Sequence, residues 1–252
     1  MTAPYYQDDS VTLYHGDCLD VLPTLDGAAV VITDPPYSEH THTSVRSRKM
    51  VESDRGARYG ADVRRVVDLG FEPLSEELRA FCAEQFARIA ARWVLVFSDV
   101  ESDHLWRNDL VENGLDYVRT GAWIKLGSTP QFSGDRPATG FEAITICHPK
   151  GRKRWNGGGR HAVWSVPIVL DRGRTGARLH TTQKPDSLIR SLVDLFSEPG
   201  EVVLDPFAGS GTTLVAATYL GRKSVGVERE EKYCEIIANR LAQGVLDFEE
   251  GA

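Results

Sequence analysis

The 252-residue chain lacks the cysteine and histidine spacing of a metal site. No Cys-x-x-Cys occurs, and no histidine lies close enough to complete a zinc signature. The four cysteines are far apart in the sequence: Cys18, Cys82, Cys147 and Cys234. We therefore expect four buried, reduced thiols, as in a protein of a reducing compartment.

Long apolar runs are also missing. No segment approaches the roughly 18 apolar residues that a membrane span needs. Residues 1–10 are polar and aromatic, without the basic start and apolar stretch of a signal peptide. These absences predict a cytoplasmic protein. The composition, 41% hydrophobic and 26% charged, is that of an ordinary globular chain, and no internal repeat is visible.

Positive charge is scarce overall but is concentrated in two segments. The net charge is −7, which at first argues against a nucleic-acid partner. Residues 40–65 nevertheless carry seven Arg and Lys against three acids, and residues 148–178 carry eight against one. A phosphate backbone responds to charge within a Debye length, so both segments are candidate nucleic-acid contacts. Two solvated loops explain the charge alone equally well.

Short apolar runs alternate with helical patterns along the chain. Residues 28–33 form a continuous apolar run, as in a strand buried on both faces. Residues 75–92 begin with a capping serine and continue with an apolar stripe at helical spacing. We expect further strands at residues 11–14, 93–97, 117–125, 143–148, 201–205 and 224–228, and helices near 101–113, 186–196, 212–220 and 231–241. The alternation predicts an α/β fold with a mostly parallel sheet and helices on both faces.

Two segments interrupt this alternation. Residues 38–70 are charged and have little periodicity, which predicts a mobile loop. Residues 149–178 are rich in glycine and arginine, which predicts an insertion rather than a core element. They are also the two segments that hold most of the positive charge.

A glycine-rich loop joins the expected strand at 201–205 to the helix at 212–220. Gly209 and Gly211 let the backbone turn tightly and approach a ligand. The crevice beyond the carboxyl end of a parallel strand is the expected ligand position. Glu228 ends the next strand, where an acid can accept the hydroxyls of a ribose. A P-loop lysine and the third glycine of a dinucleotide fingerprint are both absent, so S-adenosylmethionine, which has ribose and adenine but no phosphate, is a third candidate ligand.

A second loop follows the buried run at 28–33 and reads Asp-Pro-Pro-Tyr from Asp34 to Tyr37. Two prolines cannot continue a ladder, so the chain leaves the sheet there. An Asp carboxylate and a backbone carbonyl could each accept one hydrogen of an exocyclic amine on a nucleobase. That pairing would direct the nitrogen lone pair toward a methyl donor. Tyr37 could stack on an extruded base. A rigid turn with a capping Asp is the plain alternative.

Together the two loops resemble the amino-methylating DNA methyltransferases. The Asp-Pro-Pro-Tyr loop precedes the glycine loop, which resembles the circularly permuted β group. Residues 14–19, 136–142 and 180–185 are similar to other segments of that family. The resemblance covers residues 11–37 and roughly 93–242. One departure is Thr181, where the family often has a proline after the histidine.

The resemblance implies a fold, a cofactor and a set of site residues. The fold would be one class I methyltransferase domain over residues 1–252, with a seven-stranded Rossmann-like sheet. The cofactor would be S-adenosylmethionine, and no metal would be needed. The catalytic residues would be Asp34, Pro35, Pro36 and Tyr37. The cofactor-binding residues would be Asp17, Cys18, Asp34, Lys184, Asp205, Pro206, Phe207, Ala208, Gly209, Ser210, Gly211, Thr212, Thr213, Glu228 and Arg229.

The resemblance also implies the substrate and partners. The substrate would be double-stranded DNA, and the initial Asp of the tetrapeptide favours adenine N6 over cytosine N4. Residues 38–70 and 149–178 would recognise the target, because the family does so with variable insertions. A homodimer and a restriction endonuclease partner are further expectations, in a prokaryotic or phage setting. The alternatives are methylation of RNA or of a protein amide, and a DNA-binding module that has lost activity.

A few other residues have competing interpretations. His40 and His42 follow the tetrapeptide and could touch the substrate, although a solvated loop is the simpler prediction. Trp155 could wedge into DNA or simply pack. The remaining tryptophans stand in apolar contexts, which predicts core positions: Trp93, Trp106, Trp123 and Trp164.

Overall fold

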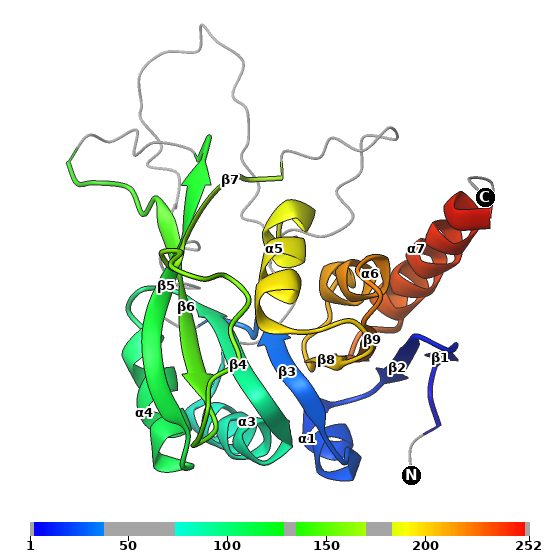
Figure 1. Cartoon of the computed structure of the whole chain (residues 1–252), viewed down its shortest axis with the longest axis horizontal. Helices are drawn as coiled ribbons and strands as arrows, with labels where there is room; N and C mark the ends of the chain where they lie inside the picture. Colours follow the sequence, from blue (N-terminus) through cyan, green and yellow to red (C-terminus); the bar gives the residue numbers. More distant parts are fainter. Residues whose placement is uncertain (1–2, 38–73, 129–134, 170–182, 250–252) are drawn as a thin grey trace, which may run out of the picture.

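The computed structural model describes residues 3–37, 74–128, 135–169 and 183–249, with side chains to residue 243 (Figure 1). Within these ranges one sheet has nine strands in the order β1-β2-β9-β8-β3-β4-β6-β5-β7. The strands are β1 (Tyr6–Gln7), β2 (Val11–His15), β3 (Ala28–Thr33), β4 (Ala90–Ser98), β5 (Asp116–Leu126), β6 (Phe141–His148), β7 (Val163–Pro167), β8 (Val202–Asp205) and β9 (Lys223–Glu228).

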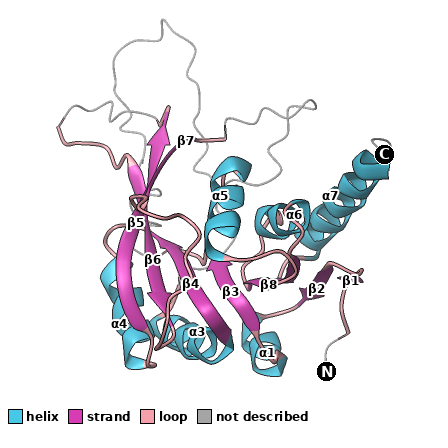
Figure 2. Cartoon of the chain, viewed as in Figure 1, coloured by secondary structure: helices cyan, strands magenta, loops and turns pink. Residues whose placement is uncertain are grey.

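Helices cover both faces of the sheet, as the alternation predicts (Figure 2). The helices are α1 (Cys18–Val21), α3 (Glu76–Ile89), α4 (Asp103–Glu112), α5 (Asp186–Phe196), α6 (Thr212–Tyr219) and α7 (Glu231–Glu249), and a 3-10 turn spans Leu22–Thr24. One core cluster joins α5 and α6 to the sheet, and a second joins α1, α3 and α4 to the opposite face. None of the helices in the described ranges is long and apolar enough to cross a membrane.

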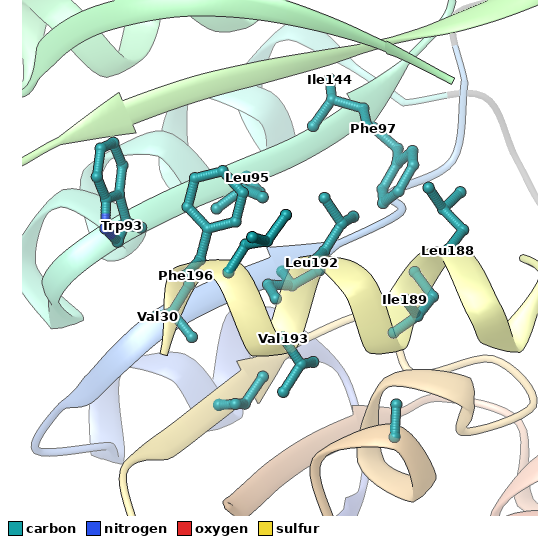
Figure 3. Close-up of a cluster of buried hydrophobic side chains, with 14 of the residues drawn as sticks. Val30, Trp93, Leu95, Phe97, Ile144, Leu188, Ile189, Leu192, Val193 and Phe196 are labelled. Atoms are coloured by element: carbon teal, nitrogen blue, oxygen red, sulfur yellow. The ribbon is translucent and has the colours of Figure 1, made fainter. Parts of the chain in front are cut away.

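Helix α5 shows how the sequence pattern builds this core. Its apolar residues recur at helical spacing and are buried against β3, β4 and β6 (Figure 3). They meet Val30 on β3, while the next residue, Val31, faces the other cluster. A strand whose successive side chains alternate between two covered faces must be apolar throughout, which explains the continuous run at 28–33. Trp93, Trp106, Trp123 and Trp164 are all buried, as expected.

The expectation of seven strands is corrected by two edge strands. β1 adds a short antiparallel pair to β2, and β7 pairs in parallel with β5. β7 lies within residues 149–178, so that segment is not merely an insertion. Trp164 of β7 is buried in the main core cluster, which is the physical reason that this stretch joins the sheet. The glycines and arginines on either side hid its five-residue pattern.

The sheet changes its direction of winding between β8 and β3. From β8 the chain passes through α6 to β9 on one side, whereas from β3 it passes through α3 to β4 on the other. β3 and β8 are parallel neighbours, with Val31 opposite Leu204. Ligands of open α/β sheets bind beyond the carboxyl ends of the strands at such a switch point. The fold therefore assigns a ligand crevice to the loops after Thr33 and Asp205.

Part of the basic segment lies at the amino-terminal ends of the central strands, opposite the switch point. The Arg154 carbonyl accepts hydrogen bonds from the Trp93 indole at 2.6 Å and from Arg92 at 3.1 Å, at the start of β4. Trp93 is aligned with Val30, three residues below Thr33, or about 10 Å along the strands. Trp155 packs on Phe196 at the end of α5, with ring centroids 4.9 Å apart. Trp155 thus packs rather than wedges, and residues 154–156 face away from the switch point.

Glu201 stabilises this amino-terminal end of the central strands. It accepts a hydrogen bond from the buried Arg92 at 2.5 Å and another from the exposed Arg154 at 3.0 Å. Because Glu201→Ala leaves the Arg92 guanidinium buried without this carboxylate, we expect it to reduce the free energy of unfolding by about 2 kcal/mol. Arg154→Ala removes only an exposed partner, and we expect a loss below about 0.5 kcal/mol. Urea unfolding measures both, and equal losses would contradict the assignment.

Candidate active site

The two predicted loops lie side by side at the switch point. Thr33, the last residue of β3, donates its hydroxyl hydrogen to Asp205 at 2.8 Å, across to the end of β8. The same carboxylate accepts the Phe207 backbone N–H at 3.2 Å and contacts Thr213. Burial raises the pKa of Asp205 to about 6, although these hydrogen bonds oppose the rise. Asp205 thus connects the strand that leads to Asp34 with the glycine loop.

The glycine loop turns tightly between β8 and α6. Gly209 and Gly211 both have positive φ, +53° and +77°, where other residues are strained. A Cβ on Gly211 would lie 2.7 Å from Ile237 of α7. Two further hydrogen bonds hold the loop: the Ala208 N–H donates to the Val227 carbonyl at 2.9 Å, and Arg240 donates to the Ser210 carbonyl. Pro206 is buried, and Thr212 and Thr213 begin α6 as buried residues.

Glu228 and Asp17 approach the glycine loop from the neighbouring strands. His15 of β2 is aligned with Glu228 of β9, which brings Asp17 to the same edge. Glu228 Oε2 accepts the Gly209 N–H and Oε1 accepts the Glu230 N–H, each at 2.8 Å. Burial raises the pKa of Glu228, and these hydrogen bonds oppose the rise. Asp17 caps α1 through the Leu19 N–H at 2.9 Å.

One predicted cofactor residue, Cys18, does not present its side chain to this crevice. The Cys18 thiol is buried in the core with Leu22, so only its backbone is available to a ligand. The Arg229 side chain is exposed, and its carbonyl accepts a hydrogen bond from the His15 ring at 3.1 Å. All four cysteines are buried and free, as expected, but Cys18 and Cys82 are neighbours in space although they are distant in sequence.

Asp34 lies at the end of a row of alternating charges. Its Oδ2 atom accepts a hydrogen bond from the Lys184 ammonium, which also lies 3.2 Å from Glu142 Oε2 and 3.4 Å from the Tyr37 hydroxyl. Glu142 Oε1 pairs with Lys125 at 2.5 Å. The second oxygen, Asp34 Oδ1, is buried and has no hydrogen-bond partner within the described part of the chain. One acceptor of this carboxylate is therefore buried and unpaired within the described residues.

The row fixes the ionisation of its members. Burial raises the pKa of Asp34 and Glu142 adds to the rise, while Lys184 offsets part of it. Burial would raise the pKa of Glu142 as well, but Lys184 and Lys125 hold it below its usual value. Burial would lower the pKa of Lys184, but Asp34 and Glu142 hold it above its usual value. Burial and then Asp34 raise the pKa of Tyr37 far above its usual value, so its hydroxyl stays protonated.

Aromatic rings surround the Lys184 ammonium. It lies 5.1 Å from the Phe97 ring centroid, 5.5 Å from that of Tyr37 and 5.9 Å from that of Trp123. These rings come from β4, the loop after β3 and β5, so three parts of the chain converge here. Pro35 is buried below the loop and Pro36 is half-buried. Favourable ring–cation contacts help to keep the buried ammonium charged.

Sequence reasoning placed some of this site and missed the rest. Lys184 was predicted to bind the cofactor and stays a prediction in that role; its ammonium contacts Asp34 and Glu142. Glu142 and Lys125 were not singled out. An acid directly before the apolar run at 143–148 was the available signal for Glu142. His40, His42, Thr181, residues 38–70 and residues 170–178 lie outside the described residues.

The fold and site define an α/β enzyme with a nucleotide-type glycine loop beside a buried carboxylate. The sequence profile of the DNA methylase family, which covers N6 and N4 methyltransferases, matches residues 28–239. The chain belongs to this family and is a DNA methyltransferase, which confirms the resemblance to the amino-methylating DNA methyltransferases.

Known proteins agree with this assignment. The chain is 26% identical to the type II methyltransferase M.HinfI of Haemophilus influenzae, over 92% of this chain and 68% of that protein. The crystal structure of an M1.HpyAVI–SAM complex superposes with a TM-score of 0.65 at 21% identity, over 92% of this chain and 98% of that one. The cytosine-N4-specific PvuII DNA methyltransferase superposes with a TM-score of 0.70 at 16% identity, over 95% and 89% of the two chains. These likenesses confirm the class I methyltransferase fold.

Proposed function

We propose that the protein transfers a methyl group from S-adenosylmethionine to the N6 amine of adenine in double-stranded DNA. The observation that carries the proposal is Asp34 Oδ1, a buried acceptor without a partner among the described residues, beside the glycine loop. An extruded base can bring an amine hydrogen to this atom.

The residues of the glycine loop fit the cofactor. Gly211 occupies a position where a side chain would clash with Ile237, so the backbone can pass close to a ligand. Glu228 retains acceptor capacity for a ribose hydroxyl, because a carboxylate has about four acceptor sites and the backbone N–H groups of Gly209, Arg229 and Glu230 use three. Asp17, the N-cap of α1 just after β2, is the residue that we propose to meet the adenine. The half-buried Phe207 offers a ring at the same edge.

The chain's own residues orient the amine for reaction. S-adenosylmethionine supplies a methyl group that its sulfonium has already activated. Asp34 Oδ1 accepts one amine hydrogen, and the Pro35 carbonyl, whose direction the double proline restricts, accepts the other. Both hydrogen bonds draw the lone pair of the amine nitrogen out of conjugation with the base and direct it across the switch point toward the methyl donor. Tyr37 stacks on the base, and positioning of the two reactants supplies most of the remaining rate enhancement.

Adenine is favoured over cytosine by the tetrapeptide. The resemblance associates an initial Asp with adenine N6 and an initial Ser with cytosine N4. The alternative is cytosine N4, and the fold does not discriminate, because the PvuII enzyme with the same fold is named cytosine-N4-specific. The proposed chemistry suits both amines.

One experiment tests the reaction and the base together. The protein is incubated with unmodified genomic DNA and S-adenosylmethionine, and the modified positions are mapped by single-molecule sequencing. We expect N6-methyladenine within one short recurring sequence. N4-methylcytosine would shift the proposal to the alternative base. Methylation of RNA or protein but not of duplex DNA would reject the DNA substrate, and failure to bind the cofactor by calorimetry would reject catalysis.

Target recognition and assembly are also proposals. Residues 154–156 lie at the amino-terminal edge of the sheet, so we assign base contacts to residues 38–70 and to the part of 149–178 that follows β7. A homodimer is supported by the apolar side chains exposed near β7, among them Val163 and Leu126. Sedimentation analysis of the protein with and without DNA tests this assembly. A restriction endonuclease partner is supported by the type II names of the relatives M.HinfI and M2.LlaDCHI.

A further inference from the structure

Glu142 stands out among the groups that the proposed reaction leaves unused. It is a carboxylate with only 7% of its surface exposed, at the start of β6, and both of its oxygens meet ammonium groups. A buried carboxylate is costly unless it is paired, and one between two lysines is well compensated. Its position at the catalytic edge of the sheet calls for a role beyond stability.

The row of charges has a definite order. Lys125 of β5 pairs with Glu142 Oε1, Lys184 pairs with Glu142 Oε2, and Lys184 also binds Asp34 Oδ2. Asp34 Oδ1 and Glu142 Oε2 both lack a hydrogen-bond partner in the described chain, but Glu142 Oε2 has the Lys184 ammonium 3.2 Å away, whereas Asp34 pairs with that ammonium through Oδ2. If Lys184 were not drawn toward Glu142, its ammonium could rotate to either oxygen of Asp34. Glu142 therefore restricts Lys184 to one oxygen and leaves the other for the target amine.

We propose that Glu142 is a positioning residue for methyl transfer, which acts through Lys184 to hold Asp34 with Oδ1 free for the amine. This inference rests on the proposed function of Asp34. Glu142 itself touches neither substrate nor cofactor. Lys125 supports it from the far side, so the effect of Lys125 is weaker and indirect.

The same arrangement predicts how kcat depends on pH. The groups that face Asp34 are Lys184 before α5, Glu142 on β6, Tyr37 on its own loop and Asp205 on β8. Glu142 raises the pKa of Asp34. Asp34 must be ionised to accept the amine hydrogen, so activity is lost as the pH falls through its pKa. Neutralising Glu142 lowers that pKa and should move the acidic limb of the kcat profile to lower pH.

The test compares Glu142→Gln with wild type over a range of pH, with purified protein, duplex DNA and S-adenosylmethionine. We expect kcat to fall about tenfold, the loss of one charge-assisted contact, with KM for both substrates unchanged. The acidic limb should move to lower pH. Glu142→Asp keeps the charge and lengthens the contact, so its kcat should fall while the limb stays near its wild-type position.

Two further variants complete the design. Glu112→Gln on the exposed part of α4 removes a charge far from the row and should leave kcat and the limb unchanged. In the background of Lys184→Met, Glu142→Gln should add little further loss, because Glu142 acts through Lys184. Thermal unfolding of each variant identifies any loss that is due to misfolding, and Glu142→Asp serves as the variant closest to the native residue.

The outcomes separate the inference from the function beneath it. A Glu142→Gln enzyme with wild-type kcat, or one that loses activity without a shift of the acidic limb, overturns the positioning role. If that occurs while Asp34→Ala is inactive, the proposed function survives. If Asp34→Ala is active, the proposed function itself fails, and the inference fails with it.

Discussion

Replacing Asp34 with alanine should reduce methyl transfer on the order of 10³-fold while leaving the binding of S-adenosylmethionine within about twofold of wild type. The variant removes the only side-chain acceptor proposed for the target amine. The glycine loop and Glu228 remain intact, because their hydrogen bonds involve Asp205 and backbone groups rather than Asp34. Methyl transfer to DNA measures the first effect, and calorimetry measures the second.

Asp26 offers a matched control for this prediction. It is an exposed acid just before β3, whereas Asp34 directly follows the same strand. Asp26→Ala should methylate DNA at the wild-type rate. Normal turnover by Asp34→Ala would end the proposed mechanism. Loss of cofactor binding in that variant would instead assign Asp34 to the cofactor site.

Replacing Gly211 with alanine should weaken S-adenosylmethionine binding at least tenfold. A residue other than glycine at φ +77° is strained by about 1–2 kcal/mol. The added Cβ also lies 2.7 Å from Ile237, so either α7 or the glycine loop must shift. A shifted loop no longer presents its backbone to the ligand. Titration calorimetry measures the affinity, and urea unfolding reports the accompanying loss of stability.

Two companion variants separate strain from steric contact. Gly200 has a similar φ of +80° with open space around it, so Gly200→Ala should cost stability but not affinity. Ile237→Ala combined with Gly211→Ala should recover part of the affinity, because it removes the side-chain atoms that the Cβ meets. The steric explanation is wrong if the double variant binds no better than Gly211→Ala alone.

The local parts of this site were predictable from sequence. Asp34 and the glycine loop each follow a continuous apolar run, and the carboxyl ends of parallel strands meet at one edge. Their neighbourhood was therefore expected, and the contact between Thr33 and Asp205 agrees with it. Glu228 was expected for the same reason, since it ends the next strand.

The charged row was not predictable in this way. Glu142 enters the site because β6 runs antiparallel between β4 and β5, so the start of β6, where Glu142 is the second residue, lies where the parallel strands end. Whether a strand runs parallel or antiparallel to its neighbours depends on the tertiary structure, and a short apolar run does not specify it. Lys184 was noticed, but the direction of its ammonium depends on Glu142, which is 42 residues away in the sequence. β7 was missed because its pattern is too short to stand out between glycine-rich neighbours.

The strand order has a consequence for how the enzyme is made. β2 and β3 are consecutive in the chain, yet β9 and β8 lie between them in the sheet. When Asp34 of a nascent chain has left the ribosome, β2 and β3 have no strands between them until residues 202–228 are synthesised. The two late strands must then insert between two early ones, a non-local step that is slow for parallel pairing. Methylation therefore cannot begin on a partly synthesised chain, and a cofactor held by the proposed residues of both early and late strands should favour the completed sheet.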